Sequence, residues 1–310
     1  MLRKKSWEWR IGELKKAFKY LTGSYSNPYL KEFNPSFKDR VRYFLGTLRI
    51  LLPLPGRYTK WWGLNFTYGL KCVYKDRKEK IFIIEKQSFK YVVPYEAYKQ
   101  FIKILKEIIF YGKNQIFPVI INEGDIVIDC GAHIGIFSLL FAKLAGKNGK
   151  VIAIEPEERN YKALTKMVKL NKDVAPIIPL KVAVYKEDCE LDLYVAKKSC
   201  CHTIAPYYEE RKRVLLDKKE KVRALKIDTI VKELNLEKVD FIKMDIEGAE
   251  IDALLGAEQT IKRFKPKLAI CTYHRPTDSE EIRKIILSYN LNYKIKEVEQ
   301  EEKVLYAWNE

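Results

Sequence analysis

Short apolar runs alternate with longer stretches of helical periodicity over the C-terminal part of this chain. Runs with the character of strands lie at 125–130, 151–154, 177–185, 241–244 and 267–273. Continuous apolar runs of this kind are typical of strands buried on both faces of a parallel sheet. Between them, apolar residues at helical spacing predict helices that begin at Ile136 and cover 157–170 and 279–287. This alternation predicts an α/β fold.

The first part of the chain carries a different pattern. Its predicted elements are helices over 7–21, 37–52 and 94–111 and alternating strands over 64–74 and 80–93. The first of these helices has an apolar stripe with Lys and Arg over much of its other face, so it is basic and amphipathic. We therefore divide the chain into an α+β N-terminal appendage, residues 1–115, and an α/β domain, residues 116–310.

Two further stretches add strands to the α/β domain. Residues 191–196 alternate like an extra strand and lead into the polar loop 197–208, for which a surface connector is one interpretation. Residues 293–298 and 303–308 predict a closing antiparallel hairpin.

Composition adds the question of partners. The 47% hydrophobic content excludes a disordered chain. The formal charge is +17, and residues 1–60 hold fourteen Lys or Arg against four Asp or Glu. Such a basic region favours an anionic partner, which is a membrane surface, a nucleic acid or an anionic substrate. Residues 3–21 are the candidate for peripheral membrane contact, although packing of the same stripe on the protein body is the commoner outcome.

The sequence also bears on location and on the cysteines. The longest apolar candidate, 43–55, is interrupted by Arg49 and is too short for a spanning helix. The basic first residues lack the apolar core of a secretory signal. We therefore expect a cytoplasmic protein, at most peripheral at the inner face of the membrane. The six cysteines form no C-x-x-C pair, so no zinc ribbon is predicted.

A glycine turn follows the strand at 125–130. Gly131 and Gly135 bracket Ala132 and His133, and Asp129 stands at the carboxyl end of the strand. A turn of this kind lets a ligand approach the backbone, with the amides of the following helix pointing at it. The alternative is a turn that serves only the packing of helix on strand.

A second acid indicates the kind of ligand. Glu155 ends the next strand, twenty residues after Gly135, where a carboxylate can accept hydrogen bonds from both hydroxyls of a ribose. The turn lacks the middle glycine that admits a dinucleotide pyrophosphate, and Asp129 would repel phosphate. A cationic, phosphate-free nucleoside fits better, and S-adenosylmethionine is such a ligand.

Polar residues also follow two later strands. Asp245, Glu247 and Glu250 come after 241–244, and His274 comes after the run that begins at Lys267. Ligands of open α/β sheets bind beyond the carboxyl ends of the strands, so Asp245 is expected beside Asp129 and Glu155, and His274 is placed for chemistry at the same edge. Capping of the following helix is the alternative role for Asp245, and complementing the dipole of that helix is the alternative for Glu250.

From about residue 125 to 307 the chain resembles the FkbM family of S-adenosylmethionine-dependent methyltransferases. The segments that carry the resemblance are DCGAHIGIFS at 129–138, IAIEP at 152–156, ALKIDTI at 224–230, FIKMDIEGAE at 241–250 and KPKLAICTYHRPTD at 265–278. The resemblance implies a Rossmann-like class I methyltransferase sheet, mostly parallel, with the antiparallel hairpin at its end. It also implies adenine contacts at Ala183 and Val184 and a site role for Asp245. For the loop 197–208 it offers a position near the active site, which is as good an interpretation as a surface connector. Family members commonly have Asn where this chain has His133.

These observations lead to a set of site predictions. The residues predicted to bind S-adenosylmethionine are Asp129, Gly131, Ala132, His133, Gly135, Glu155, Ala183, Val184 and Asp245. The predicted reaction is O-methylation of a hydroxyl on a glycan or small metabolite, with a lipid-linked glycan as the leading acceptor. His274 is the expected base, and Asp245 orients it or contacts the acceptor. A divalent metal between these two is the minor hypothesis, because the sequence offers no clear third ligand.

Three other classes of protein are also compatible with the sequence. An NAD oxidoreductase is disfavoured by the missing middle glycine. A nucleic-acid methyltransferase is suggested by the charge, but DIEG follows the strand at 241–244 in place of the motif of amino-group base methylators, which leaves RNA 2′-hydroxyls as acceptors. The third class is a membrane-surface binding module with a vestigial enzyme domain.

Overall fold

A computed structural model describes residues 41, 70–86, 88–106, 119–196, 199–205, 216–299 and 302–309 of the chain. The predicted helices at 7–21 and 37–52 lie outside the described residues, apart from Val41. The chain forms two compact units, one of residues 1–93 and 102–113 and the other of residues 94–101 and 114–310. No helix in the described part has the length and apolarity that crossing a membrane requires.

The described part of the first unit is a small sheet. Its strands are β1 (Lys71–Asp76), β2 (Ile81–Lys86) and β3 (Phe89–Pro94), in that order, and β1 and β2 are antiparallel. The predicted strand over 80–93 is therefore two strands. The helix expected from Pro94 is α4 (Tyr98–Lys106), which begins later than predicted because residues 95–97 form a turn.

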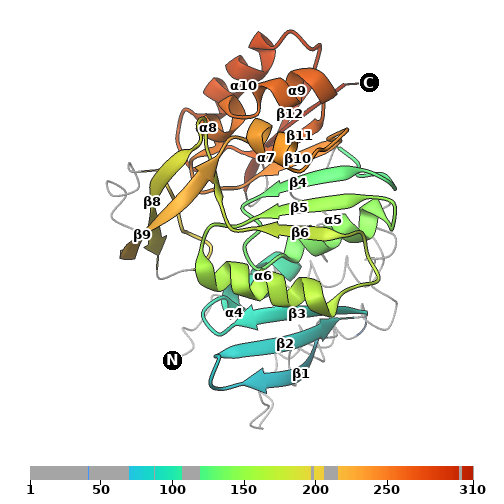
Figure 1. Cartoon of the computed structure of the whole chain (residues 1–310), viewed down its shortest axis with the longest axis vertical. Helices are drawn as coiled ribbons and strands as arrows, with labels where there is room; N and C mark the ends of the chain where they lie inside the picture. The colour runs from blue at the N-terminus through green and yellow to red at the C-terminus, as the bar shows by residue number, and fades with distance from the viewer. Residues whose placement is uncertain are drawn as a thin grey trace. The chain divides into compact units, whose positions relative to one another are not determined.

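The second unit contains a seven-stranded sheet in the order β12-β13-β11-β10-β4-β5-β6 (Figure 1). Its strands are β4 (Ile126–Cys130), β5 (Lys150–Ile154), β6 (Ile177–Leu180), β10 (Phe241–Met244), β11 (Lys267–Cys271), β12 (Lys294–Glu299) and β13 (Lys303–Trp308). Neighbours from β6 to β11 are parallel, whereas β13 is antiparallel to both β11 and β12. The predicted class I methyltransferase sheet with its terminal hairpin is confirmed.

Burial explains why the central strands read as mainly apolar runs, interrupted by Asp129 in β4 and Lys243 in β10. The last four residues of β4, β5 and β11 and all of β10 are buried, so these strands have no solvent-facing side to alternate. The helices of this unit are α5 (Ile136–Ala145), α6 (Glu158–Leu170), α7 (Ile227–Glu233), α8 (Glu250–Leu255), α9 (Glu258–Phe264) and α10 (Asp278–Ser288). Side chains from these strands and from α7 to α10 share one hydrophobic core.

A second small sheet departs from the prediction. The run at 177–185 is two strands, β6 and β7 (Ala183–Val184), and β7 pairs with β9 (Leu216–Leu225) instead of continuing the main sheet. β6 is the edge strand and contains Pro179, which has no N–H to donate to a further strand. β8 (Cys189–Ala196) completes the order β7-β9-β8 and matches the expected extra strand.

Candidate functional site

The glycine turn after β4 rests on a buried ion pair. Asp129 and Lys243 are direct neighbours on β4 and β10, and the Lys243 Nζ lies 3.1 Å from Asp129 Oδ1. The Ser138 hydroxyl donates to Asp129 Oδ2 at 2.6 Å. Burial alone would lower the pKa of Lys243, but the charges of Asp129 and Asp245 outweigh it and raise that pKa. The Asp129 carboxylate is 0% exposed and stabilises the glycine turn through these buried contacts. Its predicted contact with a ligand stays a prediction.

Lys243 is a site residue that the sequence interpretation missed. Its ammonium also donates to the carbonyl oxygens of Cys130 and Gly131, at 3.3 and 3.0 Å, and so fixes the end of β4. A lysine within an otherwise apolar buried strand was the available signal, because a buried charge needs a partner. Asp129 occupies the matching position of the neighbouring strand.

Both glycines of the turn are required by the fold. Gly131 and Gly135 have φ angles of +78° and +86°, which L side chains rarely adopt. A Cβ at Gly131 would collide with the backbone oxygen of Asp245, and one at Gly135 with the side chain of Met167. Packing alone therefore requires glycine at both positions, and the predicted approach of a ligand to this turn stays a prediction. The turn after β4 also touches the backbone of the turn after β10.

Glu155 stands at the end of β5, beside this turn. Its Oε2 accepts the N–H of His133 at 2.8 Å, and its Oε1 accepts that of Glu157 at 3.0 Å. Burial raises the pKa of Glu155 to about 7, while the two backbone donors act to lower it. His133, at φ +53°, thus presents its amide to the carboxylate in a left-handed conformation. The predicted neighbours Glu155 and His133 are brought together.

The loop 199–205 connects this region to the turn after β10. Asn160 of α6 donates to the Ser199 carbonyl at 2.8 Å, and the Ser199 hydroxyl lies 3.0 Å from His133 Nε2. At its other end the Thr203 hydroxyl donates to the backbone oxygen of Glu247 at 2.8 Å. Of the two interpretations of this loop, a position beside the site is therefore the one that the structure supports.

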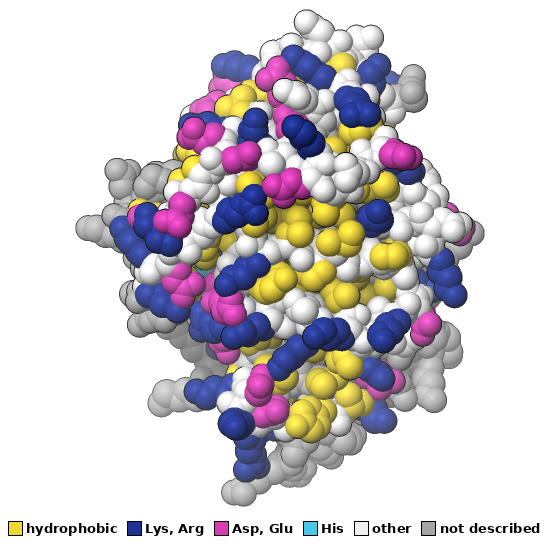
Figure 2. Space-filling model, viewed as in Figure 1, with side chains coloured by type: hydrophobic (Ala, Val, Ile, Leu, Met, Phe, Trp, Pro, Cys, Tyr) yellow, Lys and Arg dark blue, Asp and Glu magenta, His cyan; other side chains and the backbone are white. Residues whose placement is uncertain are grey.

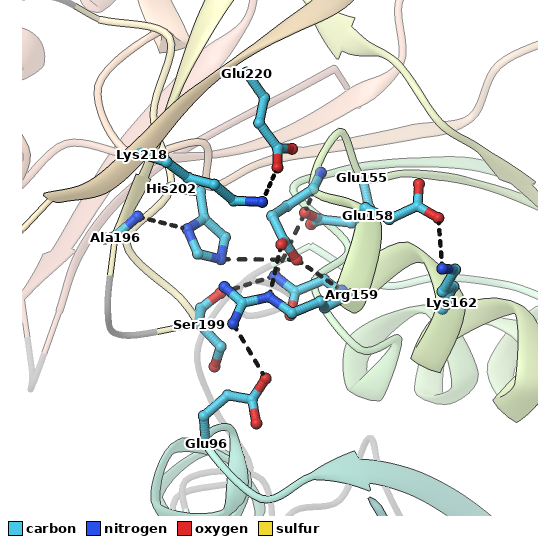
Figure 3. A network of polar contacts seen from close by, with 12 residues as sticks. Glu96, Glu155, Glu158, Arg159, Lys162, Ala196, Ser199, His202, Lys218 and Glu220 are labelled. Atoms are coloured by element: carbon cyan, nitrogen blue, oxygen red, sulfur yellow. Dashed lines mark hydrogen bonds and ion pairs between the residues drawn. The ribbon is translucent and has the colours of Figure 1, made fainter. Parts of the chain in front are cut away.

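His202 anchors the same loop in a polar network at the start of α6 (Figure 3). Its Nδ1 accepts the N–H of Ala196 at 3.0 Å, and its Nε2 faces Glu157 Oε2 at 3.9 Å. Burial lowers the pKa of His202 to about 4, so its ring is neutral at pH 7 and carries its proton on Nε2. Arg159 pairs with Glu157 at 2.9 Å and with Glu96 at 3.5 Å. This network holds the loop against α6.

Three acids surround His274 at the ends of β10 and β11. His274 Nδ1 lies 3.0 Å from Glu250 Oε1, and its Nε2 lies 3.5 Å from Glu247 Oε2 and 3.8 Å from Asp245 Oδ1. The Tyr273 hydroxyl donates to Asp245 Oδ1 at 3.0 Å. The predicted convergence of Asp245 and His274 is thus present, and Glu250 joins them.

The surroundings of His274 are not those expected of a general base. Its side chain is 1% exposed. Burial alone would lower its pKa, but the carboxylates of Glu250, Glu247 and Asp245 outweigh this and raise it to about 10. A protonated imidazole has no lone pair to accept a proton, so without a ligand at the site His274 is a counter-charge for the acids at pH 7. The Asp245 side chain is 22% exposed and the Glu247 side chain 16%.

The remaining predicted site residues are buried. Ala132 is buried in the glycine turn, and Ala183 and Val184 are buried as β7. Their contacts to a cofactor stay predictions.

Comparison with known proteins adds the family. Residues 129–295 match the sequence profile of the methyltransferase FkbM domain. Methyltransferase sdnD of Sordaria araneosa is 29% identical in an alignment 157 positions long, which covers 43% of this chain and 60% of that protein.

Two solved structures are also similar. The methyltransferase FkbM of Methylobacillus flagellatus KT has 20% identity and a TM-score of 0.49, and the match covers 97% of this chain and 60% of that chain. Aeropyrum pernix fibrillarin, solved with natively bound S-adenosyl-L-methionine, has 13% identity and a TM-score of 0.38, over 77% of this chain and 97% of that chain. At these scores the structural likeness adds nothing to the family match. The chain thus spans 60% of the length of both sdnD and the Methylobacillus protein.

Proposed function

The chain belongs to the methyltransferase FkbM domain family, and on that premise we propose that it transfers the methyl group of S-adenosylmethionine to a hydroxyl oxygen. The proposed acceptor is a glycan or a small metabolite. The observation that carries the cofactor is Glu155, which is held by two backbone amides at the end of β5 beside the glycine turn. A carboxylate fixed in this way can accept hydrogen bonds from a ribose.

The electrostatics of the crevice support a cationic ligand. Asp245 and Glu247 are the partly exposed acids of the cluster around His274, at the carboxyl edge of the sheet. Negative charge there favours the sulfonium and ammonium groups of the cofactor and disfavours a phosphate. The missing middle glycine and the bulk of Ala132 and His133 act in the same direction.

Methyl transfer needs little covalent chemistry from the protein. The acceptor oxygen attacks the methyl carbon in line with the C–S bond, the new C–O bond forms as the C–S bond breaks, and both electrons of the broken bond stay on sulfur. The hydroxyl proton leaves at the same time. We propose that the carboxylates of Asp245 and Glu247 accept this proton, because their side chains are more exposed than that of His274.

The acceptor is proposed from charge. Residues 1–60 carry fourteen basic against four acidic side chains, which favours an acceptor that is anionic or presented on an anionic surface. A glycan carried on a lipid meets this condition.

Calorimetry of the full chain tests the cofactor. We expect heat of binding from S-adenosylmethionine and from its demethylated product, and Glu155→Gln should weaken binding roughly 10- to 100-fold, because charge-assisted hydrogen bonds to the ribose are lost. Glu158→Gln is the matched control, since Glu158 lies nearby on α6 but pairs with Lys162 on the surface. A folded wild-type protein that gives no heat with either compound would overturn the proposal.

The acceptor needs a second experiment. Tritium from the labelled methyl group should pass into the lipid or glycan fraction of a cell extract. Transfer into RNA would identify the 2′-hydroxyl alternative instead.

A further inference from the structure

We propose that Asp245, Glu250 and His274 form a binding site for one divalent transition-metal ion. Each residue offers one ligand atom, and these atoms lie within 4.8 Å of one another. Two ligands of one metal at about 2.1 Å are roughly 3.0 to 4.2 Å apart, depending on the geometry. The Nε2 of His274 is 3.8 Å from Asp245 Oδ1, which is within this range and too long for a hydrogen bond.

A second observation points to a missing ligand. Glu250 is 0% exposed, and its Oε2 has no hydrogen-bond partner in the described part of the chain. Nδ1 of His274 faces Glu250 Oε1 at 3.0 Å, whereas Nε2 of the same buried ring has no hydrogen-bond partner in the described part of the chain. Buried polar atoms are seldom left in this state. A cation bound by Asp245, by Oε2 of Glu250 and by Nε2 of His274 would give both of these unpartnered atoms a partner.

The protein already holds these side chains in place. Oε1 of Glu250 accepts the N–H of Ile246 at 2.8 Å, which fixes the carboxylate at the start of α8. The Tyr273 hydroxyl donates to Asp245. The side chain of Arg275 donates to the Gly248 carbonyl and ties the turn after β10 to the end of β11. Such supporting contacts are typical of residues that orient metal ligands.

The donor atoms indicate the kind of metal. Carboxylates alone suit Mg²⁺ and Ca²⁺, whereas imidazole suits Zn²⁺, Fe²⁺ and their neighbours. One imidazole with two carboxylates therefore favours an ion of the manganese-to-zinc series. The sequence had offered only Asp245 and His274, and the fold supplies Glu250 as the third ligand.

The role of the ion rests on the proposed function. The hydroxyl oxygen of the acceptor would occupy an open position on the metal, which lowers the pKa of that hydroxyl. Its proton then passes to Glu247, which stands 3.5 Å from His274 Nε2 and is left free of the metal. The oxygen attacks the methyl carbon, and the C–S electrons remain on the departing thioether. Asp245 thereby becomes a metal ligand instead of a proton acceptor.

Mn²⁺ is the probe that tests the site. The full chain, freed of metal with EDTA and dialysed, is titrated with Mn²⁺ while the paramagnetic resonance signal of the free ion is followed. We expect one saturable ion per chain, and Glu250→Gln and Asp245→Asn should each weaken binding at least tenfold. Glu280→Gln, which removes an exposed carboxylate on α10, is the matched control and should leave binding unchanged.

A second measurement guards against variants that fail to fold. Bound ion should raise the unfolding temperature of the wild-type chain in a concentration-dependent manner, for Mn²⁺ and for Zn²⁺. Folded wild-type protein that binds neither ion overturns the site, and so does a folded Glu250→Gln protein with unchanged affinity. Calorimetry with S-adenosylmethionine in EDTA separates the two proposals. If the protein binds the cofactor but no metal, the methyltransferase proposal stands and the metal site is wrong. If it binds the metal but not the cofactor, the metal site stands and the methyltransferase proposal is wrong.

Discussion

At the scale of single residues, Glu155 is the group whose ionisation should matter most for the proposed binding of S-adenosylmethionine. It is buried, and burial raises its pKa to about 7. Because the raised pKa means that the folded state binds the proton more tightly than the unfolded state, this group contributes stability at acid pH that is lost as the pH rises through about 7. A ribose that needs both carboxylate oxygens as acceptors selects the ionised form.

The affinity for S-adenosylmethionine should therefore depend on pH. With a pKa of about 7, the ionised fraction of Glu155 falls about tenfold between pH 8 and pH 6, and we expect the binding constant to fall by the same factor. Calorimetry at pH 6, 7 and 8 measures this. Glu155→Gln removes the titrating group, so subtracting its pH profile removes any titration of the cofactor itself. Identical profiles for the two proteins would contradict the assignment.

At the scale of elements, the site depends on the pairing of β4 with β10. Asp129 and Lys243 face each other across the two strands and are buried as a pair. The lysine then secures the carbonyl groups from which the glycine turn departs. Removing one partner of a buried ion pair lowers the free energy of unfolding far more than replacing both partners together, because it leaves an uncompensated buried charge.

Lys243→Met should therefore destabilise the protein by about 3–5 kcal/mol, because Asp129 is left buried without a counter-charge. The double change Asp129→Asn with Lys243→Met should recover a large part of this loss. Urea unfolding of the wild type, both single variants and the double variant measures the coupling. Strictly additive losses would show that the two side chains do not act as a pair.

Some of the helices and strands could be predicted from the sequence and others could not. The central strands and the C-terminal hairpin were predicted within one or two residues, since double-sided burial and alternation leave clear patterns. β9 was not predicted, because its residues 218–221 are Lys, Lys, Glu and Lys and hide the alternation of Val222 and Ala224. The split of β6 from β7 depends on pairing with that unseen strand. Lys243 and the Glu250–His274 contact depend on packing between strands, which spacing along the chain does not show.

At the scale of the whole molecule, charge is the property to test. The formal charge is +17, and the first sixty residues contribute fourteen basic and four acidic side chains to it. On the face shown in Figure 2, by contrast, Lys and Arg are interspersed with Asp and Glu. The N-terminal sequence is thus the strongest candidate for contact with an anionic surface.

The full chain should float with vesicles that contain phosphatidylserine and should stay behind with vesicles of phosphatidylcholine alone. Replacing Arg3, Lys4 and Lys5 by Gln should cost about 1 kcal/mol each, or roughly a hundredfold in partitioning together. The control replaces Lys162, Lys262 and Lys284 by Gln, which removes the same charge from exposed helices. Equal losses in both proteins would assign the effect to net charge, and no flotation of the wild type would remove the membrane partner.

The contact between Gly131 and the Asp245 carbonyl has a consequence for engineering. The glycine turn after β4 and the turn after β10 touch backbone to backbone, so even a single added methyl group at position 131 would collide with the Asp245 carbonyl and force one of the two turns to move. A loop that replaces the turn after β10 will therefore have to keep this backbone contact with Gly131. A graft that moves the Asp245 carbonyl away would also remove a contact of the glycine turn after β4.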